Sequence, residues 1–284
     1  MMRAMFSGVA GLKAHQTGMD VIGNNIANVN TYGFKSSRTT YRDVYYQTLA
    51  GSSDGDQNTD ATSRLYGGRN PSQIGYGSTA ASVDVLNTRS GMVPTGKSGD
   101  CYIDGEGYFV VKDGDNYLYT RVGSMGFDAD GNLTDGNGRL VCGISGDTAT
   151  AADGKIATPA VINVADINTY KNITIGSDGK ITGEKGGTVT TLGTIALANI
   201  PNTSGLTQQG QSYFKAVSNT GDPTYYAAGT GTTGGLRTSA LESSNTDLAN
   251  EFSQMIVTQR GFQANSKIIT VSDQMLEELV NLKR

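Results

Sequence analysis

The chain has 284 residues, enough to bury a sizeable hydrophobic core in one large domain or two modest ones. Its 39 glycines, together with many Thr, Ser, Asn and Asp residues, indicate turn-rich β structure in the middle of the chain. The 22 basic and 26 acidic residues are scattered, so the composition gives no basis for a nucleic-acid partner, which would need clustered Lys and Arg.

The first 30 residues have the apolar spacing of a helix. A row of apolar residues recurs every seven positions: Met5, Leu12, Met19 and Ile26. Glycines lie inside the same segment, at Gly8, Gly11, Gly18 and Gly23. Each interior glycine costs a helix about 1 kcal/mol relative to alanine, so we expect the isolated segment to be unstable and to depend on partner helices.

Residues 35–240 alternate short apolar runs with turn dipeptides, which predicts a β-rich region. The clearest runs lie at 102–111, 117–127, 138–144, 171–183 and 193–200. Two further stretches, 50–82 and 219–235, are rich in glycine and small polar residues, and we expect them to be extended or irregular.

Residues 241–284 return to helical spacing. Their apolar row is again seven apart: Leu241, Leu248, Met255, Phe262, Ile269 and Leu276. Ser244 and Asp247 have the spacing of a capping box, which predicts a helix start just before Asp247. The sequence therefore predicts an α+β protein with N- and C-terminal helices paired as a coiled coil and a β-rich middle domain. Periodicity leaves open whether the helices pair within one chain or between subunits.

Two patterns resemble chemical motifs but do not complete them. Residues 91–98 match the P-loop spacing, yet the residues that follow alternate like a strand, and no helix is available to hold phosphates. Residues 128–139 begin like a calcium loop, but Leu133 and Arg139 occupy the positions that require Gly and Glu. We predict a hairpin turn at each place.

The other candidate residues do not form a catalytic or metal-binding set. His15 is the only histidine, so no Ser–His or Cys–His pair can be proposed, and a zinc site would need more ligands. Cys101 and Cys142 could be bridged or could be two buried free thiols, and the sequence does not decide. We predict no enzyme activity, no cofactor and no metal site.

No stretch approaches 18 apolar residues, and the N-terminus lacks the apolar core and cleavage site of a secretory signal. Composition alone would therefore place the protein in the cytoplasm. A resemblance to a known family, described next, implies a different location.

Both ends of the chain resemble the signatures of bacterial flagellar axial proteins, the rod and hook subunits. The N-terminal signature is NNIANVNTYGFKSS at 24–37, and the C-terminal one covers 242–284. Segments 95–111, 119–133 and 193–214 match the family in the same order.

The resemblance implies a helical inner domain made of residues 1–30 and 241–284, a connector at 31–75, and a β-rich domain at 76–240. It also implies that the inner domain lines a tube. We expect two rows to meet there as subunit-packing residues: Leu248, Met255, Phe262, Ile269 and Leu276 against Met5, Leu12, Met19 and Ile26.

The resemblance also implies partners and a location. The partners would be further copies of the chain in a helical homopolymer, other axial and junction proteins, an assembly cap and the flagellar type III export apparatus, with no nucleic acid and no small-molecule substrate. Export in an unfolded form, without a cleaved signal peptide, would place the protein in the hook or basal body outside the cell. The ends would stay disordered in the monomer and become ordered on assembly.

The sequence gives indications for both hook and distal rod. TYGFKS at 31–36, SALESSNTDLANEF at 239–252 and LVNLKR at 279–284 resemble hook proteins, whereas the short length and GGRNPSQIGYG at 67–77 resemble distal rod proteins. From the sequence we expect a hook subunit, part of a tubular universal joint that transmits torque from rod to filament. The alternative is a distal rod subunit, part of a drive shaft.

Overall fold

The computed structural model describes residues 2–54, 67–146, 154–165 and 167–282. The chain divides into two compact units. The first consists of residues 1–26, 37–84 and 247–284, and the second of residues 27–36 and 85–246. The predicted α+β class is confirmed, with a helix near each end and strands between them. The coiled-coil form of the helix pairing is not established, and the predicted division at residues 30, 75 and 240 stays a prediction about the assembled protein.

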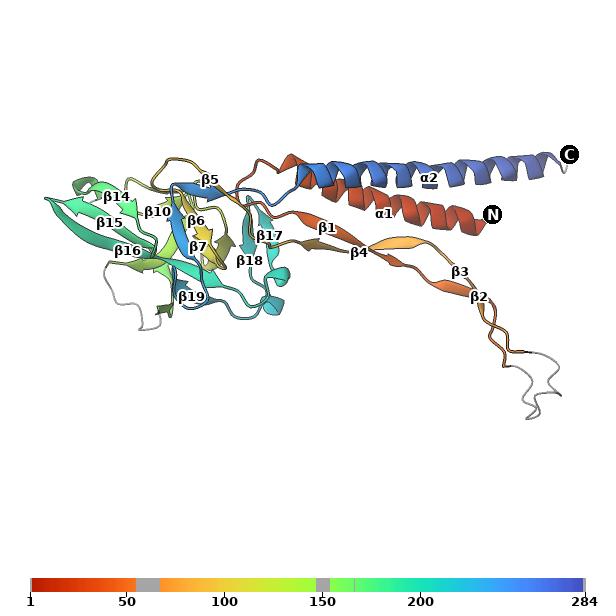
Figure 1. The fold of residues 1–284 in the computed structure, drawn as a ribbon, viewed down its shortest axis with the longest axis horizontal. Helices are drawn as coiled ribbons and strands as arrows, with labels where there is room; N and C mark the ends of the chain where they lie inside the picture. Colours follow the sequence, from red (N-terminus) through yellow and green to blue (C-terminus); the bar gives the residue numbers. More distant parts are fainter. Residues whose placement is uncertain (1, 55–66, 147–153, 166, 283–284) are drawn as a thin grey trace. The chain divides into compact units, whose positions relative to one another are not determined.

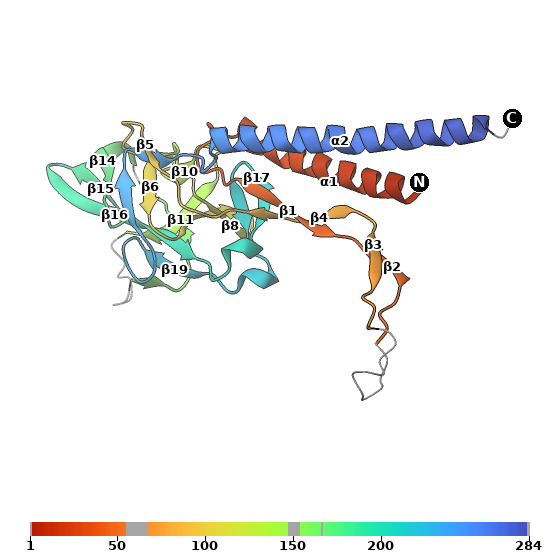
Figure 2. The same ribbon diagram turned by 45° about the vertical axis from the view of Figure 1, so that its right-hand side comes forward.

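The first unit contains two long helices and two short ribbons of paired strands. Its elements are α1 (Met2–Ala27), β1 (Ser37–Asp43), β2 (Tyr46–Ala50), β3 (Ser72–Gly75), β4 (Ser78–Val85) and α2 (Leu248–Asn281). Figures 1 and 2 both show α1 and α2 side by side and running in opposite directions. Neither described helix has the length and apolar character needed to cross a bilayer.

α2 starts at Leu248, slightly after the start predicted just before Asp247, and its cap is Asp247 rather than Ser244. Asp247 is the N-cap, and its carboxylate accepts hydrogen bonds from the backbone N–H groups of Ala249 at 3.0 Å and Asn250 at 3.4 Å. Ser244 does not cap the helix as the capping-box spacing suggested, because its hydroxyl donates to Thr246 Oγ1 at 2.9 Å. An acidic cap replaces the predicted box and also suits the positive end of the helix dipole.

The predicted irregular stretch at 50–82 contains β3 and most of β4, and its residues 55–66 lie outside the described residues. β1 pairs with β4, and β2 pairs with β3. A two-stranded ribbon is marginally stable alone, but the β1–β4 ribbon packs on α1. A Cβ placed on Gly77 would lie 3.0 Å from Ser7 O, and one on Gly18 would overlap the Tyr41 hydroxyl.

The second unit is β-rich, as predicted. Its strands are β5 (Met92–Pro94), β6 (Cys101–Asp104), β7 (Tyr108–Asp113), β8 (Asn116–Thr120), β9 (Met125–Phe127), β10 (Leu133–Asp135), β11 (Leu140–Ser145), β12 (Lys155–Ile156), β13 (Ala160–Val161), β14 (Lys171–Ile175), β15 (Lys180–Lys185), β16 (Thr188–Asn199), β17 (Thr207–Gly210), β18 (Tyr213–Lys215), β19 (Thr224–Ala227), β20 (Gly235–Thr238) and β21 (Ala240–Glu242). Short 3-10 turns lie at Ile167–Thr169, Thr203–Gly205 and Ser218–Thr220.

Among the described residues, thirteen of these strands join in one sheet, whose main path runs β12-β19-β16-β11-β7-β8-β18-β17. Two small pairs, β20 with β6 and β21 with β5, complete the unit. Each of the five predicted apolar runs overlaps at least one strand, and the glycine-rich stretch at 219–235 contains β19 between turns.

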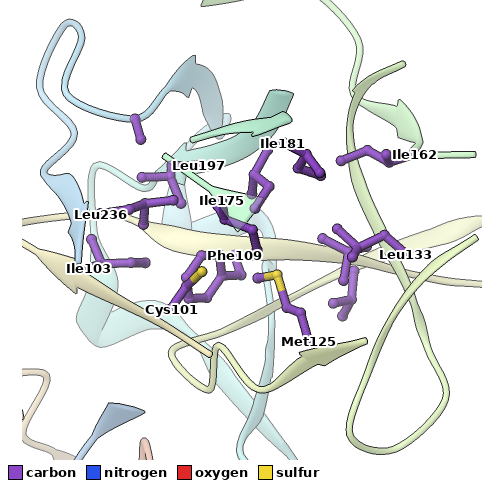
Figure 3. Close-up of a cluster of buried hydrophobic side chains, with 14 of the residues drawn as sticks. Cys101, Ile103, Phe109, Met125, Leu133, Ile162, Ile175, Ile181, Leu197 and Leu236 are labelled. Atoms are coloured by element: carbon purple, nitrogen blue, oxygen red, sulfur yellow. The ribbon is translucent and has the colours of Figure 1, made fainter. Parts of the chain in front are cut away.

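Both faces of the first four residues of β7, 108–111, are buried, which explains why these four are an unbroken apolar run. Phe109 and Val111 belong to a large core cluster, and Tyr108 and Val110 belong to a second cluster. Figure 3 shows Phe109, Cys101 and Met125 together in the large cluster, with side chains from several strands around them.

Both motif-like segments are turns between strands. Residues 95–100 connect β5 to β6, so a strand follows the P-loop-like sequence where a nucleotide site would need a helix. Residues 128–132 connect β9 to β10 as a hairpin, in which the Gly131 N–H donates to Asp128 O at 3.0 Å. The hairpin turn predicted at 128–139 is confirmed. The turn at 91–98 is not a hairpin, because β5 pairs with β21 and β6 pairs with β20.

Candidate assembly surface and chain junction

The face of α1 that meets α2 is built from small residues. Its buried positions recur at three- and four-residue spacing: Gly8, Gly11, Ala14, Gly18, Ile22 and Asn25. A Cβ on Gly8 would lie 3.3 Å from Ile269 Cγ1, and one on Gly11 would lie 2.6 Å from Asn265 Nδ2. Three of the four glycines that looked like helix-weakening residues therefore bring the helices close together. At Gly23, by contrast, no heavy atom among the described residues lies within 4 Å of an added Cβ.

The two rows predicted to pack between helices have different exposures. On α1, Met5, Leu12, Met19 and Ile26 are all half-buried, beside the small-residue face. On α2, Met255, Phe262, Ile269 and Leu276 are half-buried, whereas Leu248 is exposed. Ile269 faces Gly8 rather than a bulky α1 side chain. The proposed contact of one row with the other stays a prediction.

A further apolar surface lies on the outside of the helix pair. α2 exposes two groups of large apolar side chains: Phe252, Ile256 and Val257 near its start, and Ile268, Val271, Met275 and Leu279 near its end. α1 adds Met2 and Phe6, exposed by 63% and 60%. Contiguous exposed apolar side chains on a helix are typical of a protein–protein contact, because leaving them in water is unfavourable.

Asn25 ties three elements of the first unit together. Its Nδ2 donates to Ser37 O at 2.8 Å and to Glu251 Oε1 at 3.0 Å, while its Oδ1 accepts from the Ser37 N–H at 2.9 Å. It thus fixes the first residue of β1 and the first turn of α2 against α1. Burial raises the pKa of Glu251, the hydrogen bond from Asn25 opposes that rise, and Asp247 adds to it.

The second unit buries a cluster of three charged side chains. Lys35 Nζ lies 2.6 Å from Glu242 Oε1, and Arg121 Nη1 lies 3.7 Å from Glu242 Oε2. None of the three side chains is more than 1% exposed. Burial lowers the pKa of Lys35 below its usual value, and the neighbouring Glu242 carboxylate opposes that shift.

The surrounding backbone groups extend this cluster. Lys35 Nζ also donates to Thr88 O at 2.7 Å, and the Ser90 N–H donates to Glu242 Oε1 at 3.0 Å. Asn245 accepts from the Ser36 N–H at 2.7 Å through Oδ1.

Further hydrogen bonds complete the arrangement. Asn245 Nδ2 donates to Leu86 O at 2.8 Å, and the Gly33 N–H donates to Glu242 O at 2.9 Å. The network joins segments 33–36, 86–90 and 242–245, which lie where the chain enters or leaves the second unit. We call these three segments, with Arg121, the collar.

Sequence reasoning did not identify the collar. Its signal was present but weak, since Lys35 and Glu242 are single charges inside segments of otherwise small, polar or apolar residues. Cys101 and Cys142, left open above, are both buried and both free.

Comparisons with known proteins agree with this architecture. Three family descriptions match the chain: "Flagella basal body rod protein" at 5–35, "Flagellar hook protein FlgE/F/G D1 domain" at 102–183, and "Flagellar basal body rod FlgEFG protein C-terminal" at 237–282. The flagellar basal-body rod protein FlgG of Bacillus subtilis (strain 168) is 43% identical over 288 aligned positions, covering all of both chains. The chain belongs to the flagellar rod and hook protein family. As a member of this family it is a structural component of the flagellum and not an enzyme.

Other relatives separate rod from hook. The FlgG rod protein of Buchnera aphidicola subsp. Acyrthosiphon pisum is 34% identical over 99% of this chain and 100% of its own. The FlgE hook protein of Borreliella burgdorferi is 30% identical, and its alignment extends over 448 positions while covering both chains completely. The hook relative therefore carries inserted residues that this chain lacks. The similarity favours the rod alternative over the hook interpretation made from the sequence.

Proposed function

We propose that this protein is a subunit of the flagellar basal-body rod, in its distal part, where copies polymerise into a hollow drive shaft. The observation that carries the proposal is the alignment with the Bacillus subtilis rod protein, which needs only 288 positions for a chain of 284 residues. A hook subunit is the second candidate, supported by the hook-like segments at 31–36 and 239–252.

In this proposal the helix pair forms the inner wall of the tube. The exposed apolar side chains of α1 and α2 would be buried against neighbouring subunits. Burial of one such side chain is worth about 1.5–3 kcal/mol, so several together offset the entropy lost when subunits associate. The β-rich unit would supply contacts along and between rows of subunits.

The rows predicted from sequence belong to the same proposal. Leu12 and Phe262 represent the two rows, and both are half-buried in the single chain. An aspartate at either position would place an unpaired charge between apolar helices, so Leu12→Asp or Phe262→Asp is expected to block polymerisation while the β-rich unit stays folded. Tubes of normal length from either variant would contradict the packing role of these rows.

The outer surface can be tested separately from the rows. Met275→Asp charges the exposed apolar group near the end of α2, where Met275 is 53% exposed. Thr270→Asp, on the same helix and also exposed, adds the same charge outside that group. We expect Met275→Asp to abolish polymerisation in a sedimentation assay and Thr270→Asp to preserve it. Equal polymerisation by both would show that the group near the end of α2 is not a subunit contact.

The partners in this proposal are further copies of the chain, the neighbouring axial and junction proteins, an assembly cap, and the type III export apparatus that would carry the subunit out unfolded and without a cleaved signal. Deletion of the gene followed by electron microscopy of basal bodies distinguishes the two candidates. A truncated rod supports the rod proposal, whereas a complete rod that lacks a hook supports the second candidate.

A further inference from the structure

The collar joins the two ends of the chain through buried charges. Lys35 and Glu242 are 207 positions apart, yet their side chains meet at 2.6 Å with exposures of 0% and 1%. Removing a buried charge's partner is strongly unfavourable, because the remaining charge has lost its water without compensation. When the segment carrying Lys35 or the segment carrying Glu242 is docked alone, its buried charge has no partner. Docking of the other segment supplies that partner.

The geometry makes this dependence strong in both directions. Glu242 Oε1 accepts hydrogen bonds from Lys35 Nζ and the Ser90 N–H. Among the described residues Oε2 accepts none, and Arg121 stands 3.7 Å away. If segment 27–36 left, the carboxylate would keep one backbone donor and a distant guanidinium. If segment 240–246 left, Lys35 and Arg121 would lose the carboxylate that they share, and Arg121 would keep the longer ion pair, 3.9 Å, with the exposed Glu106.

We propose that the collar is a two-ended latch: segment 27–36 docks on the second unit only when segment 240–246 is docked there, and the reverse. These segments lead directly into α1 and α2. The latch therefore docks or releases both segments together. Its use in assembly rests on the proposed function, because a subunit with one segment undocked would then have neither segment in place when it joins the polymer.

Hydrogen exchange of the full-length, unpolymerised protein tests the latch. On the N-terminal side, the reporter is the Leu86 N–H, held by Ser36 O at 2.8 Å, because this hydrogen bond joins segment 27–36 to a residue outside segment 240–246. On the C-terminal side, the reporter is the Ser243 N–H, held by Gly91 O at 2.9 Å. The two test variants are Glu242→Gln, which keeps the side-chain shape but removes the charge, and Lys35→Met, which keeps much of the length.

The expected result is reciprocal loosening. Glu242→Gln should speed exchange at Leu86, and Lys35→Met should speed exchange at Ser243, each by roughly 10- to 100-fold, since breaking a buried pair exposes segments otherwise closed. The matched control is Asp113→Asn, which removes a carboxylate 3.4 Å from Arg139 in a more exposed position outside the collar. Its effect on both reporters should stay under about threefold.

Loosening of only the segment that carries the substitution would overturn the latch. If a single variant unfolds the whole second unit, seen as lost protection in β7, the double variant Lys35→Met/Glu242→Met decides. A latch predicts that its loss of stability is smaller than the sum of the two single losses, whereas additive losses would refute coupling. Polymerisation is scored separately, so reciprocal exchange without any tubes would contradict the proposed function and leave the latch standing.

Discussion

Alanine substitutions along α1 measure how closely the helices approach each other. Gly8, Gly18 and Gly23 all lie inside the helix, so each replacement by alanine should gain about 1 kcal/mol of helix propensity. The three positions differ in how much room surrounds the added methyl group. Comparison of the three positions therefore separates intrinsic helix stability from the packing of α1 in the first unit.

The structure sets the order of the three outcomes. At Gly23 nothing described lies within 4 Å of the added Cβ, so Gly23→Ala should stabilise the helix pair by the full amount, about 1 kcal/mol. At Gly8 the Cβ would lie 3.3 Å from Ile269 Cγ1, which must yield slightly, so the net change should be about zero. At Gly18 it would overlap the Tyr41 hydroxyl, and the cost of displacing that ring, about 1–3 kcal/mol, should exceed the gain.

Urea unfolding followed by the helical circular dichroism signal measures these differences. The expected order of stability is Gly23→Ala above wild type, Gly8→Ala near wild type, and Gly18→Ala at or below wild type. If Gly18→Ala stabilised the protein as much as Gly23→Ala, then Tyr41 would not pack against α1 and the reasoning would fail.

Three further predictions follow from burial and charge. Since burial raises the pKa of Glu251 above its ordinary 4.5, the folded state holds more protons than the unfolded state just above that pH, and the stability of the helix pair should fall as pH rises through this window. Glu251→Gln, which keeps an oxygen for Asn25, should remove that slope in urea unfolding from acid to neutral pH. Burial raises the pKa of Cys101 to about 12 and of Cys142 to about 11, so both thiols should resist alkylation until the protein unfolds, as counted by mass spectrometry. Phe109→Ala, at a fully buried position, should destabilise the second unit by about 3–5 kcal/mol in thermal unfolding.

Much of the fold was predictable because it depends on local pattern. The seven-residue apolar rows predicted both helices, and turn dipeptides between apolar runs predicted strands such as β7 and β16. These signals are local, since amphipathic spacing and tight turns act over a few residues. The close packing that the glycines of α1 allow was not predicted, for the opposite reason. Their value depends on Ile269, Asn265 and Tyr41, which no local window includes.

The collar was not predictable from the sequence by the same reasoning. Lys35 and Glu242 gain their meaning only when the fold buries both of them beside Arg121. A single charge in a polar segment is ordinarily a solvated surface residue, so nothing local distinguishes these two. The choice between rod and hook was also beyond the terminal motifs, because both kinds of subunit share them. The signal that favours the rod is the higher identity and the shorter alignment with a rod protein over the whole chain.

The hydrogen bonds of the collar also hold together the two points where the chain leaves the second unit and returns to it. The chain leaves the second unit after Ser36 and returns to it at Val85, and the Leu86 N–H donates to Ser36 O at 2.8 Å. Residues 37–84, which include β1 to β3 and most of β4, therefore form an insertion whose two ends lie close together in the second unit. An insertion of this kind can be lengthened, shortened or exchanged without changing the geometry of the second unit. The collar therefore acts as a fixed insertion point at which this architecture can accept connectors of different size.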